Sequence, residues 1–177
     1  MRIDTKCLSA LHDLRILGTA PEADYDALTR ELAQCFDVPI SMVNLLDAER
    51  DWFKACMGLP FDESPANTSF CEMFFTSRED VIVVENTAAD ERFSSHPLVV
   101  GAPHVRFYAA TRLVVEGHTV GTLCVYDTSA KQVTPRKSIA FRTSGTWRWR
   151  CSSGGGPVSR RARRLPDRSW RQPQAGC

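Results

Sequence analysis

Hydrophobic residues near the N-terminus recur at helical spacing. Leucines at three-residue steps predict a short amphipathic helix over residues 5–17, which ends at Gly18. These leucines are Leu8, Leu11, Leu14 and Leu17. The segment TAPE then places Thr19 three residues before Glu22, which is the spacing of a capping box, and predicts the start of a second helix. The apolar face of this second helix consists of Tyr25, Leu28, Leu32, Cys35 and Phe36.

The pattern then changes to one typical of strands. A strand is predicted to start near Pro39 within VPISMVNLLD, and a polar turn follows over residues 47–51. WFKACM, residues 52–57, predicts a second strand, antiparallel to the first because the connection is short. Trp52 and Phe53 are neighbours in this strand, so they should face opposite sides of the sheet. One should pack under the helices and the other toward a pocket or solvent.

The middle of the chain is less regular. Residues 58–68 are rich in Gly, Pro, Asp and Asn and predict a loop. Ser69 and Glu72 make a second capping box, so FCEMFF is expected to form one or two helical turns. DVIVVEN, residues 80–86, predicts a third strand. Residues 87–100 should form short helical or irregular pieces.

The strongest strand pattern lies over residues 105–127. Two long apolar runs are joined at Glu116, Gly117 and His118, and Gly117 can adopt the positive φ of a tight hairpin turn. Because the strands do not alternate regularly with long helices, a doubly wound parallel sheet is disfavoured. The predicted fold class is α+β, with a mostly antiparallel sheet.

Charge divides the chain into two unlike segments. The formal net charge of the whole chain is only +1. Residues 1–130 contain 10 Lys or Arg and 20 Asp or Glu, a balance of −10, whereas residues 131–177 contain 12 and 1, a balance of +11. Such a split indicates two segments with different physical roles or origins.

The final segment, residues 142–177, is rich in arginine and nearly free of aliphatic residues, so we expect it to be disordered. Before it, Thr134 and Pro135 can cap a helix whose apolar face begins at residues 139–141 and then breaks off. We interpret this abrupt end of the apolar helical pattern as the result of a reading-frame shift in a GC-rich gene. The alternative is a selected basic arm that binds nucleic acid or an anionic surface.

Other sequence features narrow the class of protein. No run approaches the roughly 18 apolar residues of a membrane span, and the N-terminus lacks the apolar core of a signal peptide. We therefore expect a cytoplasmic protein with no membrane partner. The seven cysteines include no CxxC pair, which makes a zinc site an unfavoured hypothesis, and no metal site is predicted.

Several blocks, in order, resemble one known family. They are FDVPISMVNLLDAERDWFKACMGLP, TSFCEMFF, VVENTAADERFSSHPLVVGAPHVRFYAATRL and GHTVGTLCVYD. The chain resembles the GAF sensor domains of bacterial signalling proteins, especially those found with histidine kinases and diguanylate cyclases, from about Leu14 to about Phe141. The resemblance implies a six-stranded antiparallel sheet, with helices on one face and a small-molecule pocket on the other. The expected domains are an N-terminal helix (1–18), a GAF-like sensor domain (19–141) and the basic tail (142–177).

The chain departs from several well-defined branches of this family. The cyclic-nucleotide-binding branch carries an Asn-Lys pair, but here Phe53 precedes Lys54, and Phe61 directly abuts its acidic pair. Bilin-binding relatives commonly carry Cys-His, whereas here Glu72 follows Cys71. The glycine-rich loop of free methionine sulfoxide reductases is missing. The resemblance therefore leaves the ligand, and any cofactor, unidentified.

Five residues are candidates for contacts with the ligand. They are Phe53, Cys71, His96, Arg106 and Tyr108. The cationic and aromatic residues beside the fourth strand, with His104, could hold an anionic or planar molecule. The alternatives are that Arg106 pairs with a local acid, Asp90 or Glu91, and that His96 bonds the backbone near Pro97.

Cys71 and one group of carboxylates have competing interpretations. Cys71 is expected in the first turn of a short helix, where a thiol pKa can fall, but its apolar neighbours favour a small buried packing residue. Asp47, Glu49 and Asp51 could act as acids or bases, yet a solvated turn is the favoured interpretation. No catalytic residues are predicted.

The favoured function is a non-enzymatic sensor or regulatory domain that binds a small molecule. Its kinase or cyclase output would lie in another chain or in a region lost from this one, and a homodimer is possible. The first alternative is a redox enzyme centred on Cys71, with Cys56 or Cys124 as the resolving thiol. The second is binding of nucleic acid or an anionic surface through the basic tail, of which nucleic acid is the less favoured partner.

Overall fold

A six-stranded antiparallel sheet is the centre of the fold, with strand order β3-β2-β1-β6-β5-β4. The computed structural model describes residues 3–77, 79–133, 138–142, 146–151 and 158–161. The six strands are β1 (Ile40–Leu46), β2 (Arg50–Met57), β3 (Glu63–Pro65), β4 (Val81–Val84), β5 (Phe107–Val115) and β6 (His118–Asp127). The α+β fold class predicted from the sequence is confirmed.

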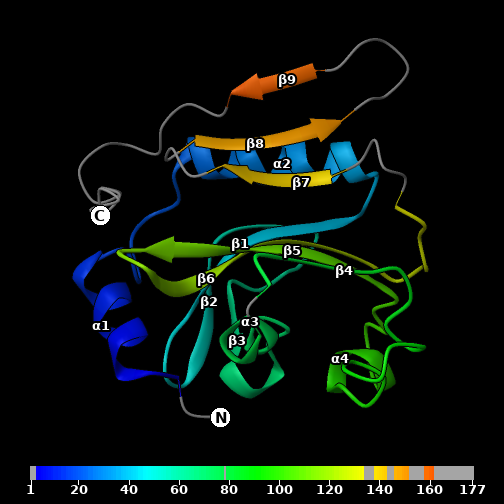
Figure 1. Cartoon of the computed structure of the whole chain (residues 1–177), viewed down its shortest axis with the longest axis horizontal. Helices are drawn as coiled ribbons and strands as arrows, with labels where there is room; N and C mark the ends of the chain where they lie inside the picture. Colours follow the sequence, from blue (N-terminus) through cyan, green and yellow to red (C-terminus); the bar gives the residue numbers. More distant parts are fainter. Residues whose placement is uncertain (1–2, 78, 134–137, 143–145, 152–157, 162–177) are drawn as a thin grey trace, which may run out of the picture.

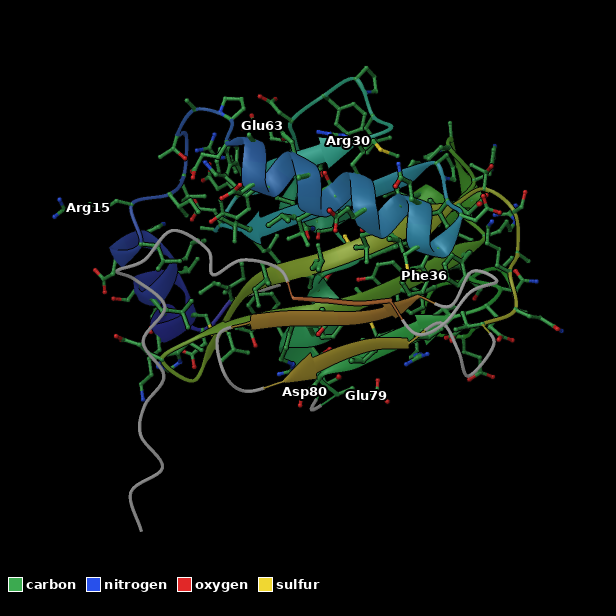
Figure 2. The ribbon with its side chains drawn as sticks, turned by 90° about the horizontal axis from the view of Figure 1, so that it is seen from above. Arg15, Arg30, Phe36, Glu63, Glu79 and Asp80 are labelled. Atoms are coloured by element: carbon green, nitrogen blue, oxygen red, sulfur yellow. The ribbon has the colours of Figure 1, made fainter. Side chains whose placement is uncertain are left out.

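Helices cover the two faces of this sheet unequally (Figure 1). The long helix α2 (Ala23–Phe36) lies across one face, where α1 (Thr5–Asp13) also packs its buried residues. The other face carries a 3-10 turn, η1 (Ala66–Thr68), and the short helices α3 (Glu72–Thr76) and α4 (Pro97–Val100). Figure 2, seen from above, shows α2 running over the sheet between the edge marked by Glu63 and the opposite edge marked by Asp80.

Side-chain alternation along the strands produces two separate cores. We call the side under α1 and α2 the helix face and the opposite side the ring face. Along β1, Val43 and Leu45 enter the helix-face core, whereas Met42 enters the ring-face core. Trp52 packs on the helix face and Phe53 on the ring face, as predicted from their adjacent positions. The sheet therefore has two buried faces.

A β-bulge in β2 places a lysine in the interior. Val43 pairs with Ala55 and Asn44 pairs with Phe53, which leaves Lys54 as the extra residue. The Lys54 side chain is fully buried, and its Nζ lies 2.6 Å from Glu22 Oε1, 2.7 Å from Thr19 Oγ1 and 2.9 Å from the Ala20 carbonyl oxygen. The bulge thus ties the α1–α2 connection to β2.

This contact also corrects the prediction of a capping box at TAPE. The helix α2 begins at Ala23 with Glu22 as its N-cap, and no side-chain hydrogen bond caps it. The Thr19 hydroxyl instead donates to the Ile16 carbonyl and accepts from Lys54. A buried ammonium needs several oxygen partners, and this need takes Thr19 away from the helix end.

The predicted hairpin between β5 and β6 is confirmed. Val115 pairs with His118, so the loop contains only Glu116 and Gly117. Both have positive φ, 50° and 81°, as the favoured two-residue hairpin turns require.

The short edge strand β3 differs from the prediction, because residues 58–68 were predicted to form a loop. Its three residues pair only with β2 and show no apolar alternation.

The C-terminal part differs from the predicted helix and disordered tail. Ser138–Arg142 forms a strand, β7, where the sequence predicted the start of a helix after Thr134 and Pro135, which lie outside the described residues. Strand pairing can satisfy backbone groups without an apolar helical face. This strand pairs with β8 (Thr146–Cys151), which pairs with β9 (Val158–Arg161). The reading-frame shift stays a prediction.

Within the part of the chain that the structure describes, no helix has both the length and the apolar character needed to cross a bilayer.

Candidate ligand-binding site

A row of polar side chains lies in the otherwise apolar ring face. The Asn44 amide donates to Asp51 Oδ2 at 2.8 Å, and the Ser69 hydroxyl donates to the same oxygen. Ser69 Oγ in turn accepts from the Cys71 backbone N–H at 3.1 Å. The row therefore joins β1, β2 and the segment that enters α3. It fixes the position of that segment against the sheet.

Asn44 is the hub of this row, and the backbone beside it is unusually close to β6. A Cβ atom at Gly121 would lie 2.0 Å from the Asn44 backbone carbonyl oxygen, so only glycine fits at this position, opposite Leu45, without displacing β1. The close approach brings Thr122 next to the Asn44 side chain, and the Thr122 hydroxyl donates to Asn44 Oδ1 at 2.6 Å. The Asn44 amide also lies 2.8 Å from Cys71 Sγ.

The directions of these hydrogen bonds assign a proton to Cys71. The Thr122 proton is used on Asn44 Oδ1, so the 2.7 Å contact between Thr122 Oγ1 and Cys71 Sγ needs the thiol as donor. Burial raises the pKa of this fully buried thiol well above its usual value, and the nearby Asp51 adds to the rise. The suggestion of a thiol pKa lowered by a helix N-terminus is therefore wrong. Cys71 lies at the N-cap of a five-residue helix, where desolvation dominates.

Asp51 is the most unusual member of the row. It is 3% exposed, and burial raises the pKa of its carboxyl to about 7 although Ser69 and Asn44 both donate to it. Among the described residues no Lys or Arg forms an ion pair with it. The prediction that Asp47, Glu49 and Asp51 share a solvated turn is wrong for Asp51, because β2 starts at Arg50 and turns this carboxyl inward.

A cluster of aromatic rings lies on the same ring face, formed by residues of β5, β6 and the segments that cover the sheet. Phe70 is the centre of this cluster. Its ring centroid lies 4.1 Å from that of His96, 5.0 Å from that of Tyr108, 5.1 Å from that of Phe93 and 5.5 Å from that of Tyr126. Three of these four pairs are edge-to-face and the fourth is tilted, and aromatic quadrupoles favour such arrangements over a face-to-face stack. We call these five residues the ring cluster.

Three buried polar atoms in and beside the ring cluster have no hydrogen-bond partner among the described residues. They are Asp51 Oδ1, His96 Nε2 and the Tyr108 hydroxyl oxygen. The His96 Nδ1 accepts from the Leu98 backbone N–H at 3.2 Å, so Nε2 carries the ring proton and is an unused donor. Burial lowers the pKa of His96 to about 4, which keeps the ring neutral near pH 7.

Four of the five residues predicted to contact a ligand belong to this region. Phe53, Tyr108 and Cys71 are buried on the ring face, and His96 packs its ring against Phe70. The hydrogen bond of His96 to the backbone near Pro97 was one of the predicted alternatives, and the Leu98 N–H makes it. Arg106 is placed differently.

The Arg106 side chain is held by the backbone. Its Nη1 donates to the carbonyl oxygens of Val99 and Val105, both at 3.0 Å. The suggested pairing with Asp90 is not made, since Arg92 takes that carboxylate at 2.7 Å. Val99 lies in the short helix α4, and the Val105 carbonyl also accepts from the Thr87 hydroxyl, so the guanidinium ties α4 to the segment before β5.

Sequence reasoning missed Asn44 and Thr122, and it assigned Asp51 to a solvated turn. Asn44 and Thr122 interrupt apolar strands at positions whose neighbours two residues away face inward, so the period of two could have identified them. Ser69 was interpreted as a cap. Within the described parts of the chain, no group of three or more His, Cys, Asp or Glu is arranged to hold a metal ion.

The buried Asp51 carboxyl predicts a pH-dependent stability. Below about pH 4 both folded and unfolded chains carry its proton. Between about pH 4 and the folded pKa of about 7 only the unfolded chain loses it, so the free energy of unfolding should fall as pH rises. The fall is at most about 1.4 kcal/mol per pH unit.

Asp51→Asn should abolish this part of the fall, as measured by urea unfolding at several values between about pH 5 and 8. Asp47→Asn is the matched control, since Asp47 bonds His12 in a half-buried turn. An Asp51→Asn variant with the same slope as the wild type would contradict the assignment.

The buried, hydrogen-bonded thiol of Cys71 should be alkylated slowly. Iodoacetamide at about neutral pH should modify the half-buried Cys7 well before the fully buried Cys71, because only a thiolate reacts. Cys71→Ser should lower the free energy of unfolding by about 1 kcal/mol, since the shorter C–O bond cannot keep both contacts. Mass spectrometry of digested samples gives the labelling rates. Equal rates for Cys7 and Cys71 would refute the neutral buried thiol.

Similarities to known proteins agree with this architecture. A cyclic di-GMP phosphodiesterase of Pseudomonas aeruginosa is 30% identical over 129 residues, which are 72% of this chain but only 22% of that relative. The chain thus spans about a fifth of that protein's length.

Two solved structures share the fold with a TM-score of 0.50. The GAF domain of a phosphoenolpyruvate-protein phosphotransferase from Coxiella burnetii is 11% identical, with 74% of this chain and 83% of that chain covered. The free methionine-R-sulfoxide reductase of Neisseria meningitidis, in complex with its substrate, is 14% identical, with 75% of each chain covered. At such identities the likeness concerns the fold alone.

A family model provides the decisive match. The model of the GAF domain matches residues 21–141, a range that contains α2 and all six strands of the central sheet. Since this range is more than half of the 177 residues, the chain belongs to the GAF domain family.

Proposed function

We propose that this chain is a non-enzymatic sensor domain that binds a small molecule on the ring face and passes a conformational change to a signalling partner. The GAF domain is a sensor and regulatory fold. The observation that carries the proposal is the set of three unpartnered polar atoms on the ring face: Asp51 Oδ1 in the polar row, and His96 Nε2 and the Tyr108 hydroxyl in the ring cluster.

Such atoms are expensive to leave unpaired. A buried donor or acceptor without a partner costs about 1–3 kcal/mol, and nearly all buried polar groups in proteins are therefore bonded. A molecule that supplied hydrogen-bonding atoms here would recover part of this cost. Sites for small molecules typically combine an apolar, aromatic lining with a few convergent polar groups. The ring cluster with these three atoms has that composition.

The cover of the ring face is suited to opening. The helices α3 and α4 have five and four residues, and helices this short have little stability of their own. Phe70 occupies the middle of the ring cluster and follows Ser69, which is bonded to Asp51. A ligand that displaced Phe70 would therefore strain this bond. It would favour one arrangement of the α3 segment over another, as a sensor requires.

The cysteine-dependent alternative has less support. Burial raises the pKa of Cys71 and Cys124 and also that of the half-buried Cys56, so none of them favours the thiolate that thiol chemistry needs. The Cys71 proton is engaged with Thr122. We therefore propose a binding role for this region.

The remaining parts of the proposal concern location and partners. The relative from Pseudomonas aeruginosa acts in cyclic di-GMP turnover, and this likeness supports a bacterial signalling role. We propose a cytoplasmic domain that assembles as a homodimer and passes its signal to a kinase or cyclase output. The basic segment after residue 141 has no role in this proposal.

A retained ligand is the direct test. Native mass spectrometry of protein purified from its own host should show an additional non-covalent mass. Tyr108→Phe should retain less of it, because a hydrogen bond to the ligand is lost. The same variant should be at least as stable as the wild type without ligand, since an unpaired buried hydroxyl is removed.

Tyr25→Phe is the control, because Tyr25 is buried on the helix face. It should retain as much ligand as the wild type. A mass retained equally by Tyr108→Phe, or host-purified protein that carries no small molecule, would oppose the proposal.

A further inference from the structure

We propose that the ring face recognises a cationic amine or amidine, whose N–H group pairs with Asp51 Oδ1 while its apolar part contacts the rings of Phe70, Tyr108 and Tyr126. This inference rests on the proposed binding function and specifies the chemical class of the ligand. It reverses the anionic ligand considered from the sequence.

The first reason is the missing counter-charge at Asp51. Its Oδ2 accepts from Asn44 and Ser69, which are both neutral, and its Oδ1 is unpaired. Among the described ion pairs, every Lys and Arg has a different carboxylate partner. A buried carboxylate is strongly disfavoured unless a cation or several donors compensate it. A positively charged N–H donor would supply both the charge and the missing hydrogen bond.

The second reason is the aromatic lining. Tyr108 and Tyr126 have ring centroids 5.1 Å apart, and each lies within 5.5 Å of Phe70. Aromatic faces carry negative charge and attract cations, an effect that strengthens when the cation is desolvated. Ser69, which donates to Asp51, directly precedes Phe70, so the carboxyl and the rings belong to the same buried face. This face favours an ammonium or amidinium group over an anion.

The third reason is that the nearby arginines are unavailable to an anion. Arg106 donates to the carbonyls of Val99 and Val105. Arg112 lies over the Phe74 ring at 5.7 Å, but its guanidinium bonds the carbonyls of Ser77 and Glu79. His96 is kept neutral by burial. The two other unpaired atoms, His96 Nε2–H and the Tyr108 hydroxyl, suit a polar acceptor elsewhere on the ligand.

Protons should compete with such a ligand at Asp51. The titratable groups that face Asp51 are Cys71 from the α3 segment, Tyr108 from β5, and Cys124 and Tyr126 from β6. Burial raises the pKa of all four, so none of them ionises between about pH 5 and 8. In this range Asp51 is the group on which binding of a cation would depend, and its protonation would oppose binding.

The test uses matched fragments that differ in charge. Phenethylamine and benzamidine are compared with 2-phenylethanol, benzamide and phenylacetate by thermal unfolding at about pH 8. The two cations should raise the melting temperature by about 3 °C at ten times their dissociation constant. The neutral and anionic fragments should not. The shift should be lost in Asp51→Asn and kept in Asp47→Asn, where the altered carboxylate belongs to the turn after β1.

A second readout needs only the wild-type chain. Binding of an amine to Asp51 at about pH 6 should release close to one proton, which calorimetry in buffers of different ionisation enthalpy measures. The affinity should fall up to tenfold per pH unit below about pH 7.

Three results would overturn the inference. They are equal shifts from the neutral fragments, an amine shift that persists in Asp51→Asn, and no shift from either cation, which would mean that ordered water alone occupies the site. A neutral or anionic molecule retained on the ring face of host-purified protein would also overturn it, yet would leave the proposed sensor function intact. Absence of any retained molecule opposes the sensor function instead.

Discussion

The link between Asp51 and the α3 segment is the constraint on which the ring face depends. The Ser69 hydroxyl and the Asn44 amide both donate to one oxygen of a carboxyl that is almost completely buried. Without these donors the Asp51 carboxyl would have no hydrogen-bond partner in an apolar layer. Without Asp51 the segment before α3 would lose its hydrogen bond to β2. The cost of burying the acid and the position of the cover are therefore coupled.

The strand β2 connects this link to the opposite side of the sheet. It carries Asp51 and Phe53 on the ring face and, at the bulge, Lys54, which contacts Glu22 and Thr19 in the α1–α2 connection. A buried ammonium with three oxygen partners resists displacement. Movement of β2 that follows a change at Asp51 would therefore reach the connection between α1 and α2. Asp51 and Lys54, the two polar groups that β2 connects, both lie in a low dielectric, where the loss of a hydrogen bond is costly.

Periodicity revealed the elements that are long and apolar. The alternation of Trp52 and Phe53, the apolar face of α2 and the turn at Gly117 were all predictable, because each depends on local spacing or on one backbone dihedral. The edge strand β3 and the strand β7 were not, because their pairing partners, rather than their own residues, determine them.

The polar part of the site was harder to predict for a related reason. Asp51 lies in the run DAERD, which is typical of a solvated turn, and only its pairing opposite β1 and β3 directs it inward. Thr19 matched a capping box until Lys54 claimed its hydroxyl. In both cases a contact between residues far apart in the sequence outweighed the local pattern. The burial of Cys71 was predictable from its apolar neighbours Phe70, Met73 and Phe74, whereas its contacts with Asn44 and Thr122 were not.

The state of the Asp51 carboxyl is the most direct test of this account. A ¹³C NMR titration of the aspartate side-chain carboxyls, assigned with Asp51→Asn, follows its proton in the folded chain. The account predicts a midpoint near 7 for Asp51 and a midpoint well below this value for Asp47, which bonds His12. An Asp51 midpoint near 4, the usual value for an exposed aspartate, would contradict the buried and uncompensated carboxyl on which the ring face depends.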